Sequence, residues 1–411
     1  MLETAPAADT MTDHSFDVIV IGAGPAGLCC SLGLAQQGYR VGLVERQSAQ
    51  AIAEPNFDGR EIALTMRSIG ILQNLGVWQR IAPDQIAPLK SAVVMTSADT
   101  HRLLIDHRET RQPALGFLVP NHGIRSAAYG CVADAPRVRL LCSRQMTGLT
   151  IDDSTVKVRC GQGETLHGRL LVVADSRFSD TRRAVGIAAD MLDFGKTMLV
   201  CRMRHEVAHR ETAWEWFKDQ YTVALLPLND RESSVVVTVS AAEALRLQQL
   251  DASEFDRDIE ARFEHRLGAM RLASTRHAYP LVASYARRFV AARCALIGDA
   301  AVGMHPVTAH GFNLGLKSQD ALLHELQRAS GSGIDIGSAQ VLHRYEAAHR
   351  KNSRSLFFAT NAIVRLYTDA RPLHRLCRSV GLRLAGRVRP VKQLMLSALT
   401  EVAPGYGVPF L

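Results

Sequence analysis

The sequence lacks the patterns that indicate a metal centre, a disulfide framework or a serine nucleophile. Its eight cysteines are scattered without a CxxC pair, so neither paired disulfides nor a zinc cluster is indicated. No His, Cys, Asp or Glu cluster has metal-ligand spacing, and no GxSxG segment, internal repeat or low-complexity stretch occurs. We therefore expect a reduced, cytoplasmic protein with no metal site.

The chain also lacks a segment that reads as a signal sequence or a membrane span. The stretch from Val18 to Tyr39 carries no charge, which superficially suggests one of the two. However, Asp13 and Asp17 precede it where Lys or Arg is expected, and the glycine cluster Gly22, Gly24 and Gly27 interrupts it. We therefore predict that the chain is not exported.

Positive charge is concentrated at one end of the chain. From Gly331 to the C-terminus there are 12 Lys and Arg against 4 Asp and Glu, whereas the first 330 residues hold 36 of each sign. A basic helical segment of this kind is either a solvated face or an attachment site for an anionic surface such as lipid headgroups. We expect no nucleic-acid partner, because the segment has no recognisable binding module or interleaved aromatics.

Residues 16–45 read as one strand–turn–helix–strand unit. The apolar run 16–21 predicts a strand buried on both faces, 28–37 predicts a helix that ends before Gly38, and 39–45 predicts a second strand. The turn between the first strand and the helix is Gly22-Ala23-Gly24-Pro25-Ala26-Gly27. It satisfies GxGxxG in the structural context that gives this motif its meaning.

This turn and the end of the second strand predict a dinucleotide site. Gly22 allows the tight turn, Gly24 lets a pyrophosphate approach the backbone, and Gly27 lets the helix pack on the strand. The free amides at the helix start hold the phosphates. Glu45 can accept hydrogen bonds from both ribose hydroxyls, which disfavours a phosphorylated ribose. The cofactor-binding residues predicted here are Gly22, Gly24, Ala26, Gly27, Glu45 and Arg46.

The rest of the chain alternates between buried strands that lead into helices and amphipathic strands. We expect helices over 61–75, 121–133, about 241–266 (as two helices) and 311–328. We expect strands over 88–108 (as a hairpin), 137–142, 145–151, 155–160, 164–174, 196–240 (several), near 272–282 and 294–297. Trp214-Glu215-Trp216 lies in this region, and we interpret its tryptophans as packing or pocket wall.

Four further blocks complete the pattern. They are Asp58-Gly59-Arg60, Leu118-Val119-Pro120-Asn121-His122, Ala174-Asp175-Ser176-Arg177-Phe178-Ser179, and Gly298-Asp299-Ala300-Ala301 followed by His305-Pro306 and Gly311-Phe312-Asn313. With the glycine turn, they resemble the flavoprotein aromatic hydroxylases of the para-hydroxybenzoate hydroxylase superfamily. Within it, the chain is similar to the ubiquinone-biosynthesis hydroxylases of the UbiH, UbiI, UbiF and UbiM type. The resemblance extends from about Phe16 to Gly381, and the last two blocks look most like the UbiM type, which oxidises the demethoxyubiquinol ring.

The resemblance implies that FAD is the bound cofactor. It places Arg60 on the FAD, Asn121 near the ribityl chain, and Asp175 in a motif that contacts FAD. In related enzymes this motif also helps to pass reduced nicotinamide, so NAD(P)H is the expected transient reductant. Ser176 stands where the motif usually has Gly, and His122 where the family usually has Arg.

The last block borders the flavin ring in the resemblance. Asp299 is implied to hold the ribityl hydroxyls, and Gly298 before it is also a predicted cofactor-binding residue. The amides at the helix start are implied to stabilise negative charge on the ring. The residues of this helix start are Gly311, Phe312 and Asn313. Three positions depart from the family's pattern, namely Val302, Ala309 and His310.

Pro306 is implied to lie over the flavin face where oxygen reacts. His305 and His310 lie in the same loop, and each is either a structural residue or an acid/base group. The candidate catalytic residues are therefore Pro306, His305 and His310, although the flavin carries the chemistry.

The predicted fold is α/β, with a Rossmann-like FAD-binding domain and an interleaved antiparallel-sheet substrate domain. We expect the FAD-binding domain to comprise residues 15–80, 110–195 and 285–330. The substrate domain comprises 85–108 and 196–282, and 331–411 form a basic helical C-terminal region.

The resemblance implies a monooxygenase that hydroxylates the aromatic ring of a polyprenylated ubiquinone precursor. It uses O2 and a reduced donor, and a flavin hydroperoxide attacks the ring. Three alternatives stay open: a flavin-dependent reductase of prenyl lipids, a hydroxylase of another aromatic substrate, and a non-catalytic flavin-binding or lipid-binding subunit. The candidate partners are a quinol-type lipid, an anionic membrane surface and a ubiquinone-biosynthesis complex. A peripheral position on the inner face of the cytoplasmic membrane is consistent with the basic C-terminal region.

Overall fold

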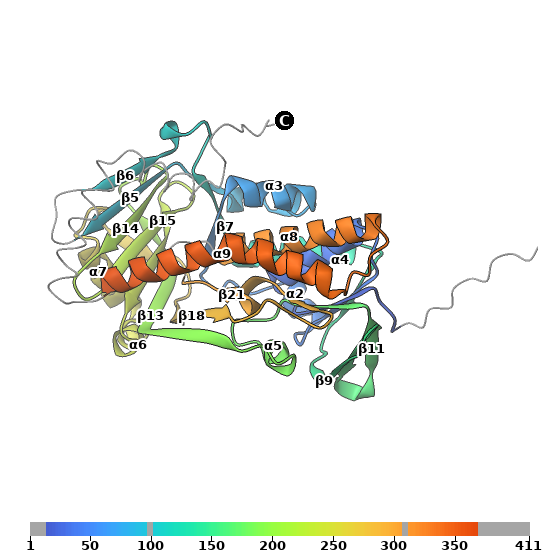
Figure 1. Ribbon diagram of the computed structural model, residues 1–411. Helices are drawn as coiled ribbons and strands as arrows, with labels where there is room; N and C mark the ends of the chain where they lie inside the picture. Colours follow the sequence, from blue (N-terminus) through green and yellow to red (C-terminus); the bar gives the residue numbers. More distant parts are fainter. Residues whose placement is uncertain (1–13, 97–101, 306–310, 369–411) are drawn as a thin grey trace, which may run out of the picture.

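The computed structural model describes residues 14–96, 102–305 and 311–368, which form two large sheets with helices packed around them (Figure 1). At one end of the molecule lie the strands β5 (Ser91–Thr96), β6 (Leu103–Asp106), β14 (Thr212–Phe217) and β15 (Thr222–Pro227). Toward the other end lie the helices α3 (Met66–Asn74), α4 (Asn121–Ala133) and α8 (Gly311–Gly331), and α9 (Ala339–Thr368) crosses between the two.

The six-stranded sheet contains the strand–turn–helix–strand unit predicted from the sequence. Its strand order is β19 (Val290–Ala291), β20 (Cys294–Leu296), β12 (Leu170–Val173), β1 (Val18–Ile21), β2 (Val41–Val44) and β8 (Val138–Leu141). All pairs are parallel except β19 with β20. The helix α1 (Pro25–Gln36) connects β1 to β2, as a parallel pair requires. This part of the sequence prediction is confirmed.

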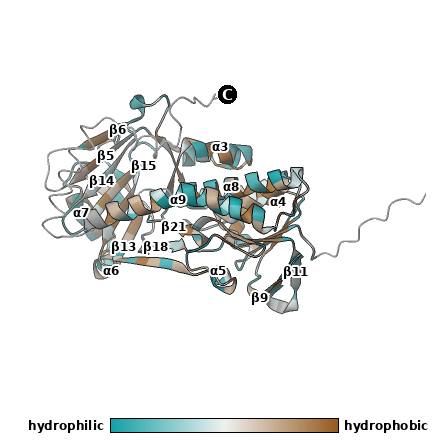
Figure 2. Cartoon of the chain, in the orientation of Figure 1, coloured by the Kyte–Doolittle hydropathy of each residue, from teal (hydrophilic) through white to brown (hydrophobic). Residues whose placement is uncertain are grey.

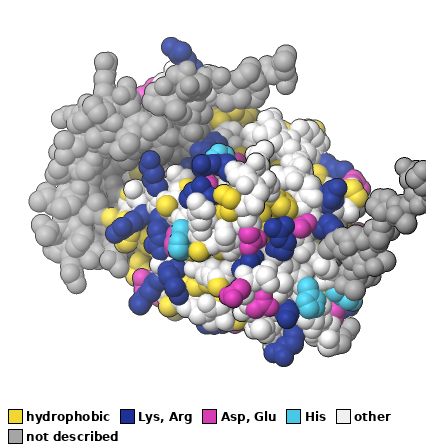
Figure 3. All heavy atoms as spheres, turned by 45° about the vertical axis from the view of Figure 1, so that its right-hand side comes forward, with side chains coloured by type: hydrophobic (Ala, Val, Ile, Leu, Met, Phe, Trp, Pro, Cys, Tyr) yellow, Lys and Arg dark blue, Asp and Glu magenta, His cyan; other side chains and the backbone are white. Residues whose placement is uncertain are grey.

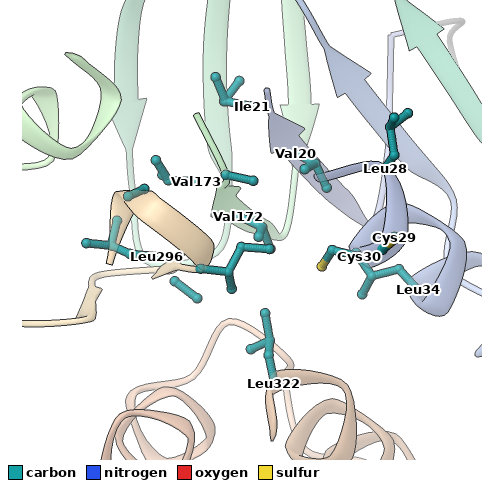
Figure 4. Packing of buried hydrophobic residues seen from close by; sticks show 14 of the residues in the cluster. Val20, Ile21, Leu28, Cys29, Cys30, Leu34, Val172, Val173, Leu296 and Leu322 are labelled. Atoms are coloured by element: carbon teal, nitrogen blue, oxygen red, sulfur yellow. The ribbon is translucent and has the colours of Figure 1, made fainter. Parts of the chain in front are cut away.

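The helix α1 is buried between the six-stranded sheet and the helix α8 (Gly311–Gly331). Figure 4 shows side chains of α1 beside those of the sheet strands, with Leu322 of α8 facing them from the opposite side. The α1 residues labelled there are Leu28, Cys29, Cys30 and Leu34, and all four are fully buried. The adjacent cysteines therefore act as small hydrophobic side chains, and burial raises the pKa of the Cys30 thiol to about 12.

The second large sheet has nine strands and is mostly antiparallel. Its order is β21 (Val302–Gly303), β18 (His277–Ala286), β13 (Ala189–His205), β16 (Glu232–Val239), β15 (Thr222–Pro227), β14 (Thr212–Phe217), β5 (Ser91–Thr96) and β6 (Leu103–Asp106), and β17 (Met270–Leu272) pairs with β13. The pair β5–β6 is the predicted hairpin. Helices α6 (Ala241–Gln249) and α7 (Ala252–Arg262) pack on one face of the sheet through a buried apolar cluster.

Two small three-stranded sheets complete the architecture. One joins β9 (Met146–Ile151), β10 (Val156–Cys160) and β11 (Thr165–Gly168), and its apolar residues join the core of the six-stranded sheet. The other joins β3 (Glu61–Leu64), β7 (Gly116–Pro120) and β4 (Ala87–Leu89). The helix α4 (Asn121–Ala133) follows β7 at the predicted position, and α2 (Ala49–Ala53) and α5 (Asp180–Ala184) are short.

The prediction of a single helix over 61–75 is wrong in its first part. Glu61–Leu64 is the strand β3, and the helix α3 (Met66–Asn74) begins only after Thr65. The Thr65 side chain caps that helix by accepting a hydrogen bond from the Ser68 amide. Pairing of β3 with β7 outweighs the helix-like spacing of the apolar residues, because tertiary contacts override a weak local periodicity.

The surface of the described chain carries mixed charge. On the face in Figure 3, Lys and Arg side chains lie among Asp and Glu, in keeping with the balanced charge of the first 330 residues. Hydrophilic and hydrophobic residues alternate along α9 (Ala339–Thr368), which packs against α8 (Figure 2). Within the described ranges, no helix combines the length and the apolar character that a membrane crossing requires.

Candidate active site

A cavity of about 430 Å³ is lined by residues of both large sheets. The six-stranded sheet contributes the turns that follow β1, β12 and β20, where parallel strands end at one edge. The nine-stranded sheet contributes apolar side chains from β13, β15 and β16, namely Met198, Val200, Ala224, Leu226 and Val236. The predicted cofactor turns and the apolar sheet therefore share one site.

Three glycines of the first turn meet different spatial requirements. Gly22 has φ +104°, and a Cβ there would lie 2.8 Å from the Ala174 carbonyl oxygen. A Cβ at Gly27 would lie 1.8 Å from the Gly22 carbonyl oxygen, so α1 could not pack as it does. A Cβ at Gly24 would meet nothing within 4 Å, and Gly24 lines the cavity. The open space at Gly24 fits the close approach of a ligand to the backbone.

The start of α1 has the properties of an anion site. No side chain caps the helix, and its first turn carries no acidic residue. Its first amides are thus available, and they lie at the positive end of the helix dipole. Because Gly24, Pro25 and Ala26 line the cavity, this helix end faces a place where a pyrophosphate fits.

Glu45 and Arg46 lie at the end of β2. Glu45 is buried, and its carboxylate accepts hydrogen bonds from the backbone amides of Ala23 (2.7 Å) and Gln47 (2.9 Å). It therefore braces the glycine turn, and its ribose contact stays a prediction. Arg46 is exposed and does not line the cavity.

Arg60 and Asn121 line the cavity and share one carboxylate. The Asp58 Oδ2 atom accepts hydrogen bonds from the Arg60 guanidinium (2.6 Å) and from the Asn121 amide (2.8 Å). Partial burial favours a raised pKa at Asp58, but the hydrogen bonds and charge of Arg60 outweigh it and lower the pKa. The Tyr279 hydroxyl donates to the Asp58 carbonyl oxygen at 2.6 Å. The sequence pattern did not identify Asp58 or Tyr279 as site residues.

Asp175 and Asp299 also line the cavity. Burial raises the pKa of Asp175, and its Oδ1 atom is buried without a hydrogen-bond partner among the described residues. Such an acceptor fits a ligand hydroxyl, because a buried polar atom without a partner is costly. Arg177 holds Asp299, with Nη2 2.8 Å from Asp299 Oδ2, and it also donates to the Val282 carbonyl oxygen. The sequence did not assign a role to Arg177.

The turn after β20 and the start of α8 face the same cavity. Gly298 has φ +56° and packs against Ala26, where an added Cβ would lie 3.1 Å from the Ala26 Cβ. Gly311 and Phe312 line the cavity, and a Cβ at Gly311 would meet nothing within 4 Å. Asn313 is buried, and its side chain bonds the backbone of β3 and the start of α3 instead of lining the cavity.

The predicted catalytic residues are only partly described. His305 lines the cavity, and its ring lies edge-on to Phe194 at 4.7 Å between centroids. Burial, and secondly the charge of Arg177, lower the pKa of His305 to about 4, so the ring is neutral at pH 7. Pro306 and His310 lie outside the described residues, as does Ala309. Of two departures from the family's pattern, Ser176 lines the cavity, whereas His122 is not among the lining residues and packs edge-on against Phe57.

Several cavity residues carried no signal that the sequence analysis used. Glu215, Lys196 and Phe217 all line the cavity. For Glu215 and Phe217, the alternation of side chains along β14 was the available signal, because successive side chains of a strand point to opposite faces. Trp214 and Trp216 pack in the apolar cluster with α7, so their interpretation as packing residues is confirmed.

Comparison with known proteins now decides the family. The family described as FAD binding domain matches residues 15–355. The chain belongs to this family. It is 42% identical over 394 residues to the ubiquinone hydroxylase UbiM of Neisseria meningitidis, a match that covers 95% of this chain and 85% of that protein. It is 32% identical to the ubiquinone hydroxylase UbiL of Rhodospirillum rubrum (93% and 89% covered) and 27% identical to the 3-demethoxyubiquinol 3-hydroxylase of Escherichia coli (94% and 98% covered). The resemblance to the ubiquinone-biosynthesis hydroxylases is therefore confirmed, and so are FAD as cofactor and the class of flavin-dependent aromatic hydroxylases.

Solved structures confirm the fold class. The Pseudomonas aeruginosa protein PqsL, in complex with 2-aminobenzoylacetate, has a TM-score of 0.75 at 21% identity, covering 87% of this chain and 97% of that one. The p-nitrophenol 4-monooxygenase PnpA of Pseudomonas putida has a TM-score of 0.74 at 18% identity, covering 94% of this chain and 99% of that one. Both structures share the α/β architecture of this chain.

Proposed function

We propose that this FAD-dependent hydroxylase acts on the ring of a prenylated, demethoxyubiquinol-type quinol, with O2 and a reduced donor as co-substrates. The observation that carries the proposal is the shared cavity. Glycine turns and a helix start that fit FAD lie on one side of it, and a sheet face with mostly apolar side chains lies on the other. The names of the relatives UbiM and UbiL and of the Escherichia coli enzyme support the substrate class.

The chain's own residues would position the reactants and exclude water. FAD, when bound, would activate O2, one atom of which enters the ring. The open backbone at Gly24 would bind the pyrophosphate, and Asp175 and Asp299 would accept hydrogen bonds from the sugar-like hydroxyls. Met198, Val200 and the other apolar side chains of the sheet would hold the ring and keep the site dry.

The division into domains follows from the same proposal. Residues 15–80, 110–195 and 285–330 would bind FAD, and residues 85–108 and 196–282 would bind the ring. This assignment is supported by the cavity, whose glycine turns come from the first set and whose apolar wall comes from the second.

Labelled oxygen tests the proposed reaction. The purified FAD-loaded enzyme is mixed with a short-chain demethoxyubiquinol, a reduced nicotinamide and ¹⁸O2, and the quinol is analysed by mass spectrometry. We expect one labelled oxygen on the ring and oxygen consumption that the substrate stimulates. A product that has gained hydrogen on its prenyl chain but no label would instead support a reductase. Anaerobic bleaching of the flavin by NADH or NADPH identifies the donor.

For a lipid-tailed substrate, the proposal includes attachment of the basic C-terminal region to anionic lipid. Val364 of α9 lines the cavity, so the described part of this region reaches the substrate site. Lys351 and Arg354 are exposed on the same helix. Each basic residue near an anionic surface contributes about 1 kcal/mol, so a few suffice for weak attachment.

Vesicle sedimentation tests this attachment. Removal of residues 369–411 is the suitable truncation, because Tyr345 and other residues of α9 are part of the core. We expect the full chain to bind vesicles with anionic lipid, binding to weaken with salt, and the truncated chain to bind less. Neutral phosphatidylcholine vesicles are the control. Equal binding of both chains to both vesicles would contradict the attachment.

A further inference from the structure

One carboxylate lies on the cavity face of the nine-stranded sheet. In β14, Trp214 and Trp216 pack with α7 on one face, and Glu215 and Phe217 line the cavity on the other. Among the described residues through which this sheet lines the cavity, Glu215 is the only acidic one. A glutamate here faces the site instead of solvent.

The cross-strand partners of Glu215 that line the cavity are apolar. Glu215 pairs with Ala224 of β15, Ala224 pairs with Val236 of β16, and Val236 pairs with Val200 of β13. All four line the cavity. Glu215 is therefore the only polar residue of these four. Val94 and His277, which continue the row on either side, are not among the residues that line the cavity. The other polar residues of this sheet that line the cavity are Lys196, Thr222, Ser234 and Thr238.

No protein group among the described residues satisfies this carboxylate. None of the described residues forms a hydrogen bond or an ion pair with the Glu215 carboxylate. Burial raises the pKa of Glu215 to about 8. A buried carboxylate without a hydrogen-bond partner costs folding free energy, unless a ligand supplies the hydrogen bond.

The other charged groups of the cavity are committed elsewhere. Lys196 donates to the Gln220 carbonyl oxygen at 3.5 Å, and Arg177 holds Asp299. Arg60 is paired with Asp58, and Glu61 is paired with Arg202 at 2.6 Å. Asp175 and His305 are the remaining titratable groups that line the cavity in the described chain, and neither contributes to the shifted pKa of Glu215.

We propose that Glu215 binds the phenolic hydroxyl of the substrate and accepts its proton as the ring is attacked. The inference rests on the proposed function and adds a catalytic residue to it. In this step the phenol O–H bond breaks, an O–H bond forms at the Glu215 carboxylate, and the electron pair stays on the phenol oxygen. Nothing is oxidised or reduced, and the ring gains the electron density that oxygen transfer needs. Glu215 returns the proton to solvent or to the product.

The proton affinity of Glu215 suits this task. A general base works best when its pKa lies near the operating pH, and proton transfer of this kind contributes about 10²- to 10⁴-fold to rate. An ordinary exposed glutamate is far too weak a base for a phenol. The apolar wall of Ala224, Val236 and Val200 corrects that mismatch by desolvating the carboxylate.

Binding without turnover tests the proposal independently of the reaction. The FAD-loaded Glu215→Gln variant and the wild type are titrated anaerobically with a demethoxyubiquinol analogue that carries one prenyl unit, and flavin fluorescence is followed. We expect the wild-type affinity to rise as pH passes from 7 to 9, because the carboxylate form is the acceptor. The variant should bind about tenfold more weakly or worse above pH 8, without that pH dependence. The dimethyl ether of the same quinol has no phenolic proton to donate, so both proteins should bind it alike.

Turnover gives the second readout. We expect kcat/KM of the wild type to rise with pH through about 8. In Glu215→Gln, kcat/KM should no longer rise with pH, and kcat should fall about 10²-fold. Glu215→Asp should keep the rise of kcat/KM with pH and show a smaller fall in kcat. Glu254→Gln, on the exposed side of α7, is the matched control and should behave as wild type.

The outcomes separate the two proposals. A Glu215→Gln variant with normal FAD content, the same pH dependence of binding as the wild type and kcat within about threefold would overturn the role of Glu215 while leaving the hydroxylase intact. A wild type that incorporates no labelled oxygen would overturn the proposed function. In that case the binding titration still decides whether Glu215 receives a phenolic hydroxyl.

Discussion

The replacement Gly24→Val separates cofactor binding from folding within one turn. The backbone at Gly24 has φ −69° and ψ 173°, which valine adopts readily, and an added Cβ meets no protein atom within 4 Å. The folded chain should therefore tolerate the change. The new side chain projects into the space through which a pyrophosphate would approach the start of α1.

The expected loss follows from the contacts that the valine blocks. Two hydrogen bonds from helix-start amides to a charged phosphate contribute about 1.5–3 kcal/mol each. Losing both costs about 3–6 kcal/mol, which corresponds to about 10²- to 10⁴-fold weaker FAD binding. The purified variant should be colourless, with a melting temperature close to that of the wild-type apoprotein.

Two companion variants make the assay decisive. Gly70→Val in α3 also enters open space but lies away from the cavity, so it should keep FAD. Gly27→Ala should fail differently, by preventing α1 from packing, because its Cβ would lie 1.8 Å from a backbone oxygen. Calorimetric titration of the apoproteins with FAD gives the affinities. If Gly24→Val bound FAD within about threefold of wild type, the helix-start site would be refuted.

Three further predictions concern stability. Asn313→Ala removes a 3.1 Å hydrogen bond from the Thr65 amide and a 2.8 Å hydrogen bond to the Ala63 carbonyl oxygen. It should lower the free energy of unfolding, measured by urea titration, by about 2–4 kcal/mol. A loss below about 0.5 kcal/mol would show that these two backbone groups find other partners. Trp216→Ala empties a place in the cluster with α7 and should cost about 3–5 kcal/mol, whereas unchanged urea stability would mean that the sheet and helix collapse onto each other. Burial lowers the pKa of His349 to about 3, so the unfolded chain binds more protons between that pKa and the ordinary value near 6.5, and wild-type stability should fall as pH drops through this window. His349→Phe should flatten this acid dependence, and identical melting curves from pH 7 to 4.5 for both proteins would disprove the role of this histidine.

The local sequence was sufficient for the glycine turn. Gly22, Gly24 and Gly27 were identified from spacing alone, because a tight turn, an open approach and a close helix–strand contact each exclude a side chain. The strand before the turn and the helix after it were equally evident, since a strand buried on both faces reads as one apolar run. Such features depend on neighbours within about thirty residues of chain.

Predictions that needed distant partners were less complete. Residues 61–64 have a helix-like apolar spacing, yet their pairing with β7 makes them a strand. The resemblance places Asn313 at the flavin, which stays a prediction, and it did not reveal that the amide group of Asn313 holds the start of α3, more than two hundred residues earlier in the chain. The sequence near these residues does not predict either contact.

The sequence by itself determined the cofactor turn, the α/β class and the uneven distribution of positive charge, because each depends on residue type and short spacing. Only the tertiary structure decided that Glu215 faces the cavity while its two tryptophan neighbours face the core. It also decided that Arg177 is committed to Asp299. The physical reason is that desolvation and pairing depend on what surrounds a side chain in space. The sequence does not distinguish a strand glutamate in water from one in an apolar wall.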